Sequence, residues 1–335
     1  MEQEDLYPQV LRHIQSGDYP AAVSILATFP GAKESDAWAQ IAAELLAGER
    51  VEKRPLDAIP ILRRLAEAGD AHCQQLLGSI LVRGRDVAQD VYGGIALLEQ
   101  AGAQGKTYSL ASLSQMYRHG FGPIAVDPGK CVNYLQQAAD LGDVETMLTL
   151  CGDYEAGFGV QASPEKCFEL NRKVAAAGDV RGNFNLGVAY EYGRGVDVND
   201  EDAFKNYYIA ANAGIMLAQH NLGARFFNGR GTVQNKLHGI NWYMHAAAHD
   251  SSLSQHCLGL AFFKGDGVDI NPVAALSWFM LALQNGHVES QSYFDNLVSQ
   301  TKKEDFEKAQ HVAENFKLYW REQTADSDRL TTTSD

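Results

Sequence analysis

The chain has 335 residues, 45% of them hydrophobic, and its 28 Lys and Arg against 42 Asp and Glu give a formal net charge of -14 at pH 7. Such an acidic balance argues against a nucleic-acid partner, because phosphate backbones are bound by neutralising cations. No apolar run approaches the roughly 18 residues of a membrane span, and the start, MEQEDLYPQV, lacks a basic region followed by an apolar segment. We therefore expect a cytoplasmic protein without a membrane span.

The first part of the chain predicts two helical hairpins. In LYPQVLRHIQSGDYPAAVSILATF the apolar residues follow a helical spacing on both sides of a Gly-Asp-Tyr turn, which predicts a capping hairpin over residues 1–32. Residues 33–68 keep the register of the units that follow and read as a degenerate repeat. Its Pro60 is tolerable if the second helix of that repeat begins near Leu56.

One 36-residue unit, Gly178 to Ala213, recurs on both sides of itself. The period slips by only one residue, between Gly105 and Gly142. A fixed period of this length is the signature of a stacked array of supersecondary units. Six repeats are predicted over residues 69–285, with the bounds 69–104, 105–141, 142–177, 178–213, 214–249 and 250–285.

Recurring residue types inside the unit predict helix A, a glycine loop, helix B and a glycine turn. A leucine followed by a small residue, as in Leu186-Gly187, lets a partner helix approach closely. Each copy then has Gly at the position of Gly193, which suits a helix end with positive φ. Asp, Asn or Ser follows at the position of Asn199, where a side chain can cap helix B. The fold class is therefore all-α.

The chain closes with a half repeat and a capping helix over residues 286–322. Between Glu304 and Arg321, an amphipathic helix is indicated by the apolar residues Phe306, Ala309, Val312, Phe316 and Trp320. Such a helix would cover the last apolar face of the array. The polar residues 323–335 are expected to be a disordered tail.

Three segments carry a resemblance to a known family. They are NFNLGVAYEYGRGV at 183–196, HNLGARFFNGRG at 220–231 and CLGLAFFKGDGV at 257–268. This pattern resembles the Sel-one-like repeat (SLR) family, a relative of the tetratricopeptide repeat, over about residues 33 to 299. The resemblance implies a right-handed α/α superhelical solenoid with a tetratricopeptide-like first hairpin. It also implies a non-enzymatic adaptor or scaffold that binds a protein partner, or a bacterial immunity protein that neutralises a secreted toxin.

The same resemblance places helix A on the concave side of the solenoid and so predicts the binding residues. Aromatic side chains beside Arg and His are typical of protein-binding surfaces. The predicted partner-binding residues are Arg181, Phe184, Glu191, Tyr192, His220, Phe227, Asn228, His256, Phe263 and Lys264. Leu217 and Leu253 share the helix position of Arg181 and belong to the same face.

The sequence contains only incomplete matches to phosphate-binding and metal-binding motifs. Gly105, Lys106 and Thr107 look like the end of a phosphate-binding loop, but Gln100 stands where its first Gly is required. His245 and His249 could share a metal, yet no Glu between them completes an HExxH motif. We expect no catalytic residues, no cofactor and no metal, and a metal-dependent enzyme is the remote alternative.

The five cysteines are odd in number and stand at scattered repeat positions, which favours buried thiols over a secreted disulfide framework. Cys151 and Cys167 occupy the small positions of helix A and helix B in one repeat, and they are predicted to be neighbours. They could be two packed thiols or a disulfide. We expect packed thiols, and hence five reduced cysteines in the chain.

Overall fold

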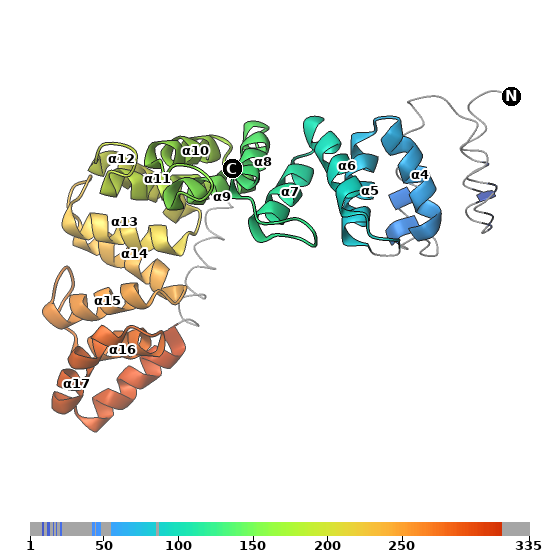
Figure 1. Cartoon of the computed structure of the whole chain (residues 1–335). Coiled ribbons are helices and arrows are strands. Elements are labelled where there is room, and N and C mark those ends of the chain that lie inside the picture. Colours follow the sequence, from blue (N-terminus) through green and yellow to red (C-terminus); the bar gives the residue numbers. More distant parts are fainter. Residues whose placement is uncertain are drawn as a thin grey trace, which may run out of the picture. The chain divides into compact units, whose positions relative to one another are not determined.

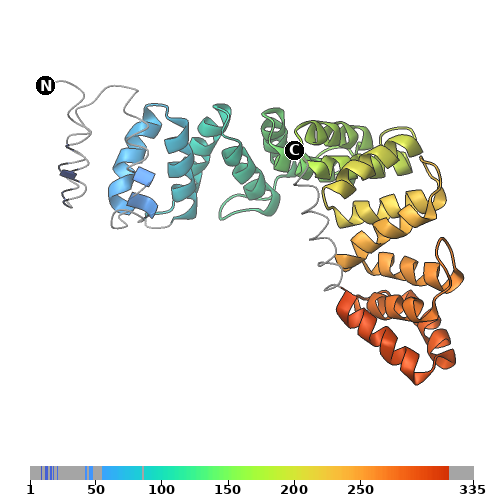
Figure 2. The ribbon, with the colours of Figure 1, turned by 180° about the vertical axis from the view of Figure 1, so that it is seen from behind.

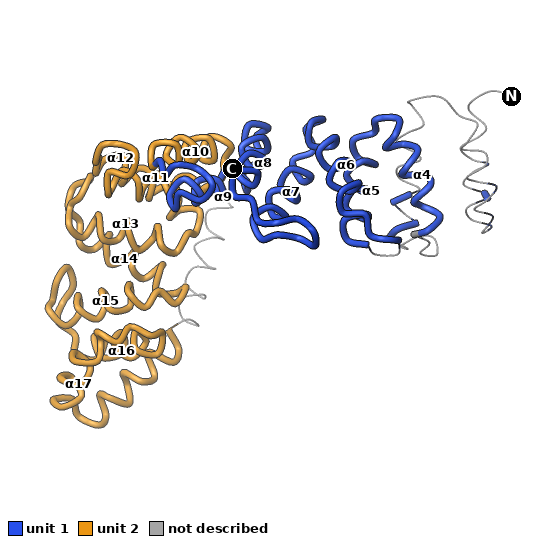
Figure 3. The backbone as a smooth tube through the Cα atoms, viewed as in Figure 1, with its two compact units in different colours: residues 1–163 blue, residues 164–335 orange. Residues whose placement is uncertain are grey.

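The computed structural model describes residues 55–84 and 87–316 continuously, together with isolated positions before residue 48. Most of the predicted hairpin over residues 1–32, Trp320 and the predicted tail over 323–335 lie outside the described residues. The chain separates into two compact units, residues 1–163 and 164–335, which are coloured separately in Figure 3. Each unit is described below by itself.

Both units are built of helices that pack in consecutive pairs, as Figure 1 and the reverse view in Figure 2 show. The first unit contains α4 (Pro55–Glu67), α5 (Ala71–Arg83), α6 (Val91–Ala103), α7 (Thr107–His119), α8 (Pro128–Asp140) and α9 (Val144–Ala156). The second contains α10 (Pro164–Ala176), α11 (Val180–Tyr192), α12 (Asp200–Asn212), α13 (Met216–Asn228), α14 (Lys236–Ala248), α15 (Ser252–Lys264), α16 (Pro272–Gln284), η3 (Val288–Ser290) and α17 (Gln291–Gln300). The all-α solenoid predicted from the repeat pattern is confirmed. Pro60 lies inside α4, whose start at Pro55 agrees with the predicted start near Leu56.

Capping explains why these helices start and stop where they do. At the start of α14, the side chain of Asn235 accepts a hydrogen bond from the backbone N–H of His238 at 3.0 Å. At the end of α11, Gly193 adopts φ 67° and its N–H donates to the carbonyl of Ala189. Both caps stand at the positions that the sequence predicts. They recur through the described repeats and give helices of uniform length.

The core runs along the seam between helix A and helix B. The recurring leucine of helix A is buried in each repeat, at Leu77, Leu113, Leu150, Leu186, Leu222 and Leu258. Beside it, a Cβ added to Gly78 would lie 2.8 Å from the carbonyl oxygen of Gly94, and one added to Gly223 would lie 3.0 Å from that of Gly239. The small residues are therefore required by the close approach of the two backbones.

The last apolar face is covered by α17 and by a helix over residues 303–316. Phe316 of that helix meets Trp278 of α16 edge to face, with ring centroids 4.5 Å apart. Ala309 is fully buried, as predicted. Val312 was expected inside but is 46% exposed, and Ala313 is buried in its place. Phe306 and Phe316 pack against the same core cluster, so the predicted apolar face is confirmed except at Val312.

Among the described residues, no helix is long and apolar enough to cross a membrane.

Candidate functional site

The ten predicted binding residues lie on α11, α13 and α15, the helices A of three consecutive repeats. They occupy the second, fifth, twelfth and thirteenth positions of these helices, so they share one face. Arg181, Tyr192, Asn228 and Lys264 are exposed. Phe184, Glu191, His220, Phe227, His256 and Phe263 are half-buried. The second position also exposes two leucines, Leu217 at 53% and Leu253 at 47%.

Each of the three phenylalanines is partly exposed on this face and partly packed against other aromatic rings. Phe184 packs against Tyr207 of α12 with ring centroids 6.1 Å apart, and Phe227 packs at the same distance against Tyr243 of α14. Phe263 meets Tyr293 of α17 edge to face at 6.0 Å. Phe184 and Phe227 therefore support the hairpins that carry them, and Phe263 links α15 to α17. The rings cannot be removed without loss of packing.

The two histidines form equivalent bridges between repeats. His220 Nδ1 lies 2.8 Å from Ser254 Oγ in the next repeat, and His256 Nδ1 lies 2.8 Å from Ser290 Oγ. Burial lowers the pKa of His220 to about 4, so its imidazole is neutral at neutral pH. Burial also lowers the pKa of His256, with a further contribution from His287, whose ring stacks on it at 4.3 Å.

Beneath this face lies an ionic cluster that the sequence did not reveal. Arg225 of α13 is only 2% exposed and pairs with Glu191 of α11 at 3.3 Å and with Asp200 of α12 at 2.9 Å. Arg230 pairs with the same two carboxylates from the surface, and Tyr207 donates a hydrogen bond to Glu191 at 2.7 Å. The side-chain hydrogen bond from Arg225 lowers the pKa of Asp200. Glu191 is thus a structural link as well as a predicted binding residue.

The same two positions carry reversed charges in the first unit. Arg118, the twelfth residue of α7, pairs with Asp153, the tenth residue of α9, at 2.5 Å. Glu191 and Arg225 hold these positions in α11 and α13. The phenyl ring of Phe158 lies 4.6 Å from the Arg118 guanidinium carbon, and Asp153 is buried. The interface between helices A can therefore hold a charge pair of either orientation.

The expectation of five reduced cysteines is wrong. Cys73, Cys131 and Cys257 are free, whereas Cys151 and Cys167 are disulfide-bonded. Of the two readings of the pair, the disulfide is the one observed.

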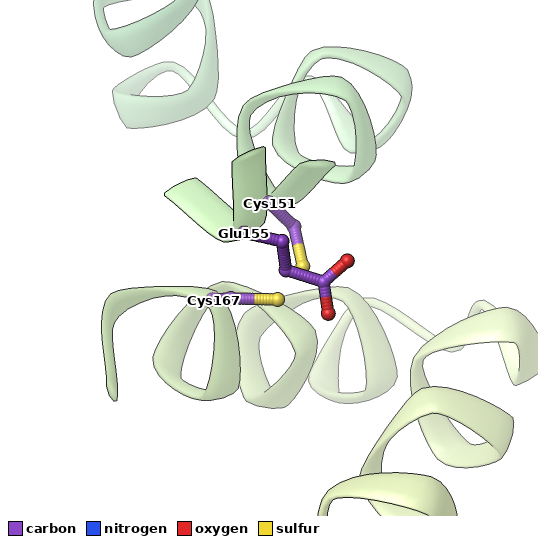
Figure 4. A group of neighbouring side chains, drawn as sticks. All are labelled: Cys151, Glu155 and Cys167. Carbon is purple, nitrogen blue, oxygen red and sulfur yellow. The ribbon is translucent and has the colours of Figure 1, made fainter. Parts of the chain in front are cut away.

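Metal ligation has little support at either candidate place. Figure 4 shows Cys151 and Glu155 on α9 beside Cys167 on α10, with the possible ligand atoms within 4.8 Å of one another. A disulfide offers no thiolate, so these cysteines do not ligate a metal in the oxidised state seen here. His245 and His249 interact, since burial and then His249 lower the pKa of His245. No group of three possible ligands within the described part of the chain includes them.

Comparisons with known proteins agree with this architecture. The Sel1 repeat matches six segments, residues 71–106, 107–143, 148–179, 180–215, 217–251 and 252–287. No curated protein matches the chain.

Solved structures share the fold at low sequence identity. A protective antigen of uropathogenic Escherichia coli with an SLR fold is 23% identical, with a TM-score of 0.69 over 94% of this chain and 67% of its own. A Sel1 repeat protein from Oxalobacter formigenes is 22% identical, with a TM-score of 0.57 over 87% of this chain and 89% of its own. Because the six matched segments span more than half of the residues, the chain belongs to the Sel1 repeat family.

Proposed function

We propose that this protein is a non-enzymatic adaptor or scaffold, and that a protein partner binds the helix A face of α11, α13 and α15. The observation that supports this is the repetition of exposed apolar groups on that face. Leu217 and Leu253 stand at the same position of successive helices, and Tyr192 of the preceding helix is 63% exposed. Repeat arrays present such surfaces to partners in register with their own period.

The character of the face matches a protein interface. Exposed Arg181, Asn228 and Lys264 share this face with the leucines and Tyr192. A polar rim around apolar and aromatic groups is the usual composition of protein-protein interfaces. The half-buried Phe184 and Phe227 on the same face pack against Tyr207 and Tyr243 of the helices B. We therefore expect the partner to contact the leucines and Tyr192 directly.

The test is a double change, Leu217→Ser with Leu253→Ser, in the full chain. The two leucines are mostly outside the core, so the variant should fold with unchanged circular dichroism. Loss of central anchors costs about 2 kcal/mol or more, roughly thirtyfold in affinity. Affinity for a partner captured by the unmodified chain should fall by at least that factor when measured by calorimetry.

A matched control is Leu237→Ser with Ile270→Ser. These residues are 56% and 66% exposed, but they lie in α14 and in the loop before α16. This variant should bind normally. Equal loss in both variants, or in neither, would show that the partner uses another surface. The change Phe227→Ala with Phe263→Ala is less suitable, since both rings also pack in the core.

Neutralisation of a bacterial toxin is the second candidate and uses the same face. An immunity protein of Pseudomonas aeruginosa, Pa5087, is 18% identical, but its TM-score of 0.36 is too low to support a functional argument. Coexpression with the product of a neighbouring toxin gene distinguishes the two roles. Rescue of growth by the unmodified chain, and not by the leucine variant, is the result expected for an immunity protein.

A further inference from the structure

A cleft of about 570 Å³ opens between α4 and α6, the helices B of two adjacent repeats, with α5 as its floor. Leu77 and Leu81 of α5 and Leu97 of α6 form its apolar lining. Arg63, Glu67 and Asp90 stand among its polar lining. Its volume is within the range of protein sites that take small ligands or side chains. The cleft is far in sequence from the face proposed above and does not depend on that proposal.

The floor of the cleft lacks an aromatic ring that the later repeats have. The eleventh residue of helix A is aromatic in the five repeats that follow, at Tyr117, Tyr154, Tyr190, Phe226 and Phe262. In α5 this position is Leu81. A leucine is shorter than any of these rings, so the space above α5 is less filled.

The wall of the cleft lacks a bridging side chain. At the seventh position of helix B, Tyr134 reaches back to Glu99 of the preceding helix B, with an O···O distance of 2.5 Å. Trp242 at this position meets Tyr208 of α12, with ring centroids 6.5 Å apart. In α6 the seventh residue is Leu97, and the ninth residue of α4 is Arg63. Leu97 offers Arg63 no ring and no hydroxyl, and both side chains line the open cleft.

The rim lacks a long side chain as well. At the third position of helix B, Lys130 extends over the ring of Tyr117 at 4.9 Å, and His238 meets Phe226 edge to face at 5.5 Å. Gly93 takes this position in α6. Leu81, Leu97 and Gly93 thus stand at the positions that Tyr117, Tyr134 and Lys130 hold in the next repeat.

We propose that this cleft binds an aromatic side chain of a peptide segment that carries a lysine or arginine beside the aromatic residue. The chain itself shows what fits, because a tyrosine with a lysine over its ring fills the equivalent place between α6 and α8. A bound ring would lie against the half-buried Leu97, above Leu77 and Leu81 of the buried floor, and face the guanidinium of Arg63, which is attracted to aromatic faces. The neighbouring cation would lie near Glu67 and Asp90, the two carboxylates of the rim.

The test uses a synthetic hexapeptide with a central Lys-Trp pair, and the full chain with labelled leucine methyl groups. The peptide should shift the resonances of Leu77, Leu81 and Leu97 in a saturable way. Replacement of its Trp by Ala should weaken binding by about tenfold or more, since an aromatic anchor dominates such contacts. Replacement of its Lys by Glu should also weaken binding, by a smaller factor.

The decisive variant closes the cleft with the residues found in the next repeat, Leu81→Tyr with Leu97→Tyr. It should fold, as shown by circular dichroism, and lose the peptide. If it does not fold, the single change Leu97→Tyr serves the same purpose at the wall of the cleft. Leu237→Tyr, which adds a ring to an exposed position of α14, is the matched control and should bind as the unmodified chain does. The proposal is overturned if the peptide causes no saturable shift, or if the closed variant binds it equally well.

Discussion

Arg225 brings three helices together through one side chain. It comes from α13, pairs with Glu191 at the end of α11 and with Asp200 at the start of α12, and lies 5.3 Å from the ring centre of Tyr207. A guanidinium has enough donors in one plane to serve two carboxylates at once. Because the Arg225 side chain is only 2% exposed, this residue is costly to remove.

Arg225→Ala should therefore destabilise the second unit strongly. The Arg225 side chain is only 2% exposed, so the change empties a buried volume and removes a hydrogen bond between charged groups, which typically costs about 1.5 to 3 kcal/mol. Arg230→Ala is the matched control, because Arg230 pairs with the same carboxylates but its side chain is 48% exposed. This control should cost less than about 1 kcal/mol. Urea unfolding of both variants makes the comparison, and equal costs would contradict a buried role for Arg225.

The bridge from His220 to Ser254 predicts a stability that depends on pH. The pKa of His220 in the folded protein is lowered from its ordinary value of 6.5 to about 4. Between these two pH values the unfolded chain therefore binds more protons than the folded protein does. Stability from this group is complete above about pH 6.5 and falls as the pH drops toward about 4, by up to about 3 kcal/mol.

His220→Asn keeps a polar side chain that does not titrate, so the unfolding free energy of this variant should change less with pH. Urea midpoints measured from pH 7.5 down to 4.5 give the slope for each protein. His256 remains in the variant and retains its own contribution, since its pKa is lowered too. An unchanged slope in the Asn variant would mean that His220 is not buried as a neutral ring.

At the scale of the element, the second glycine of three loops, at Gly159, Gly195 and Gly231, has a role beyond its backbone conformation. Gly231 adopts φ 71°, and an added Cβ would lie 1.9 Å from the carbonyl oxygen of Asp200, the first residue of the helix B in the preceding repeat. The loop thus rests directly on the neighbouring helix. Gly214 has φ 88° but has no atom within 4 Å of an added Cβ.

Gly231→Ala should consequently cost much more stability than Gly214→Ala. Both changes place a side chain in the left-handed region, which costs about 1 kcal/mol or somewhat more. Only the first also forces the loop away from α12, so we expect at least twice the loss of unfolding free energy. Equal losses would show that the loop can move without disturbing its neighbour.

The elements could be predicted because their signals are local and repeated. Capping residues, the glycine ends and the buried leucines each depend on a few neighbouring residues, and the period reinforces them. The candidate surfaces were harder to foresee. Exposure of Leu217, burial of Arg225 and the open cleft beside Leu97 depend on what the adjacent repeat offers at the same position. The disulfide was missed because a favourable spacing of two cysteines does not reveal whether they are oxidised.

At the scale of the whole molecule, the loss of stability caused by a core substitution should remain in the repeats next to that substitution. Helices pack mainly against their sequence neighbours, and Leu113 and Leu222 belong to separate apolar clusters. Leu113→Ala and Leu222→Ala should each cost about 2 to 5 kcal/mol of local stability. Hydrogen exchange should show the loss of protection in each cluster separately, and the two effects should add. Leu98→Ala with Leu113→Ala, two changes within one cluster, is the contrasting pair and should not add.

The number of titratable thiols tests whether Cys151 and Cys167 are bonded. Denatured and unreduced protein should show three titratable thiols, and reduction should raise the number to five, because Cys151 and Cys167 are bonded and the remaining three are free. Five thiols before reduction would contradict the disulfide. The reduced protein can then be compared with the oxidised one by thermal unfolding.

The reversed charge pairs limit how the array can change length by recombination. If residues 142–213 were lost, the helix A after α7 would be α13. Arg118 would then meet Arg225 instead of Asp153. Loss of residues 142–177 alone would set Arg118 against Ala189, the tenth residue of α11. Either product would bury a cation without its carboxylate. Repeats that look interchangeable by their glycines and leucines therefore carry an order, and a duplication or deletion persists only where the facing side chains still match.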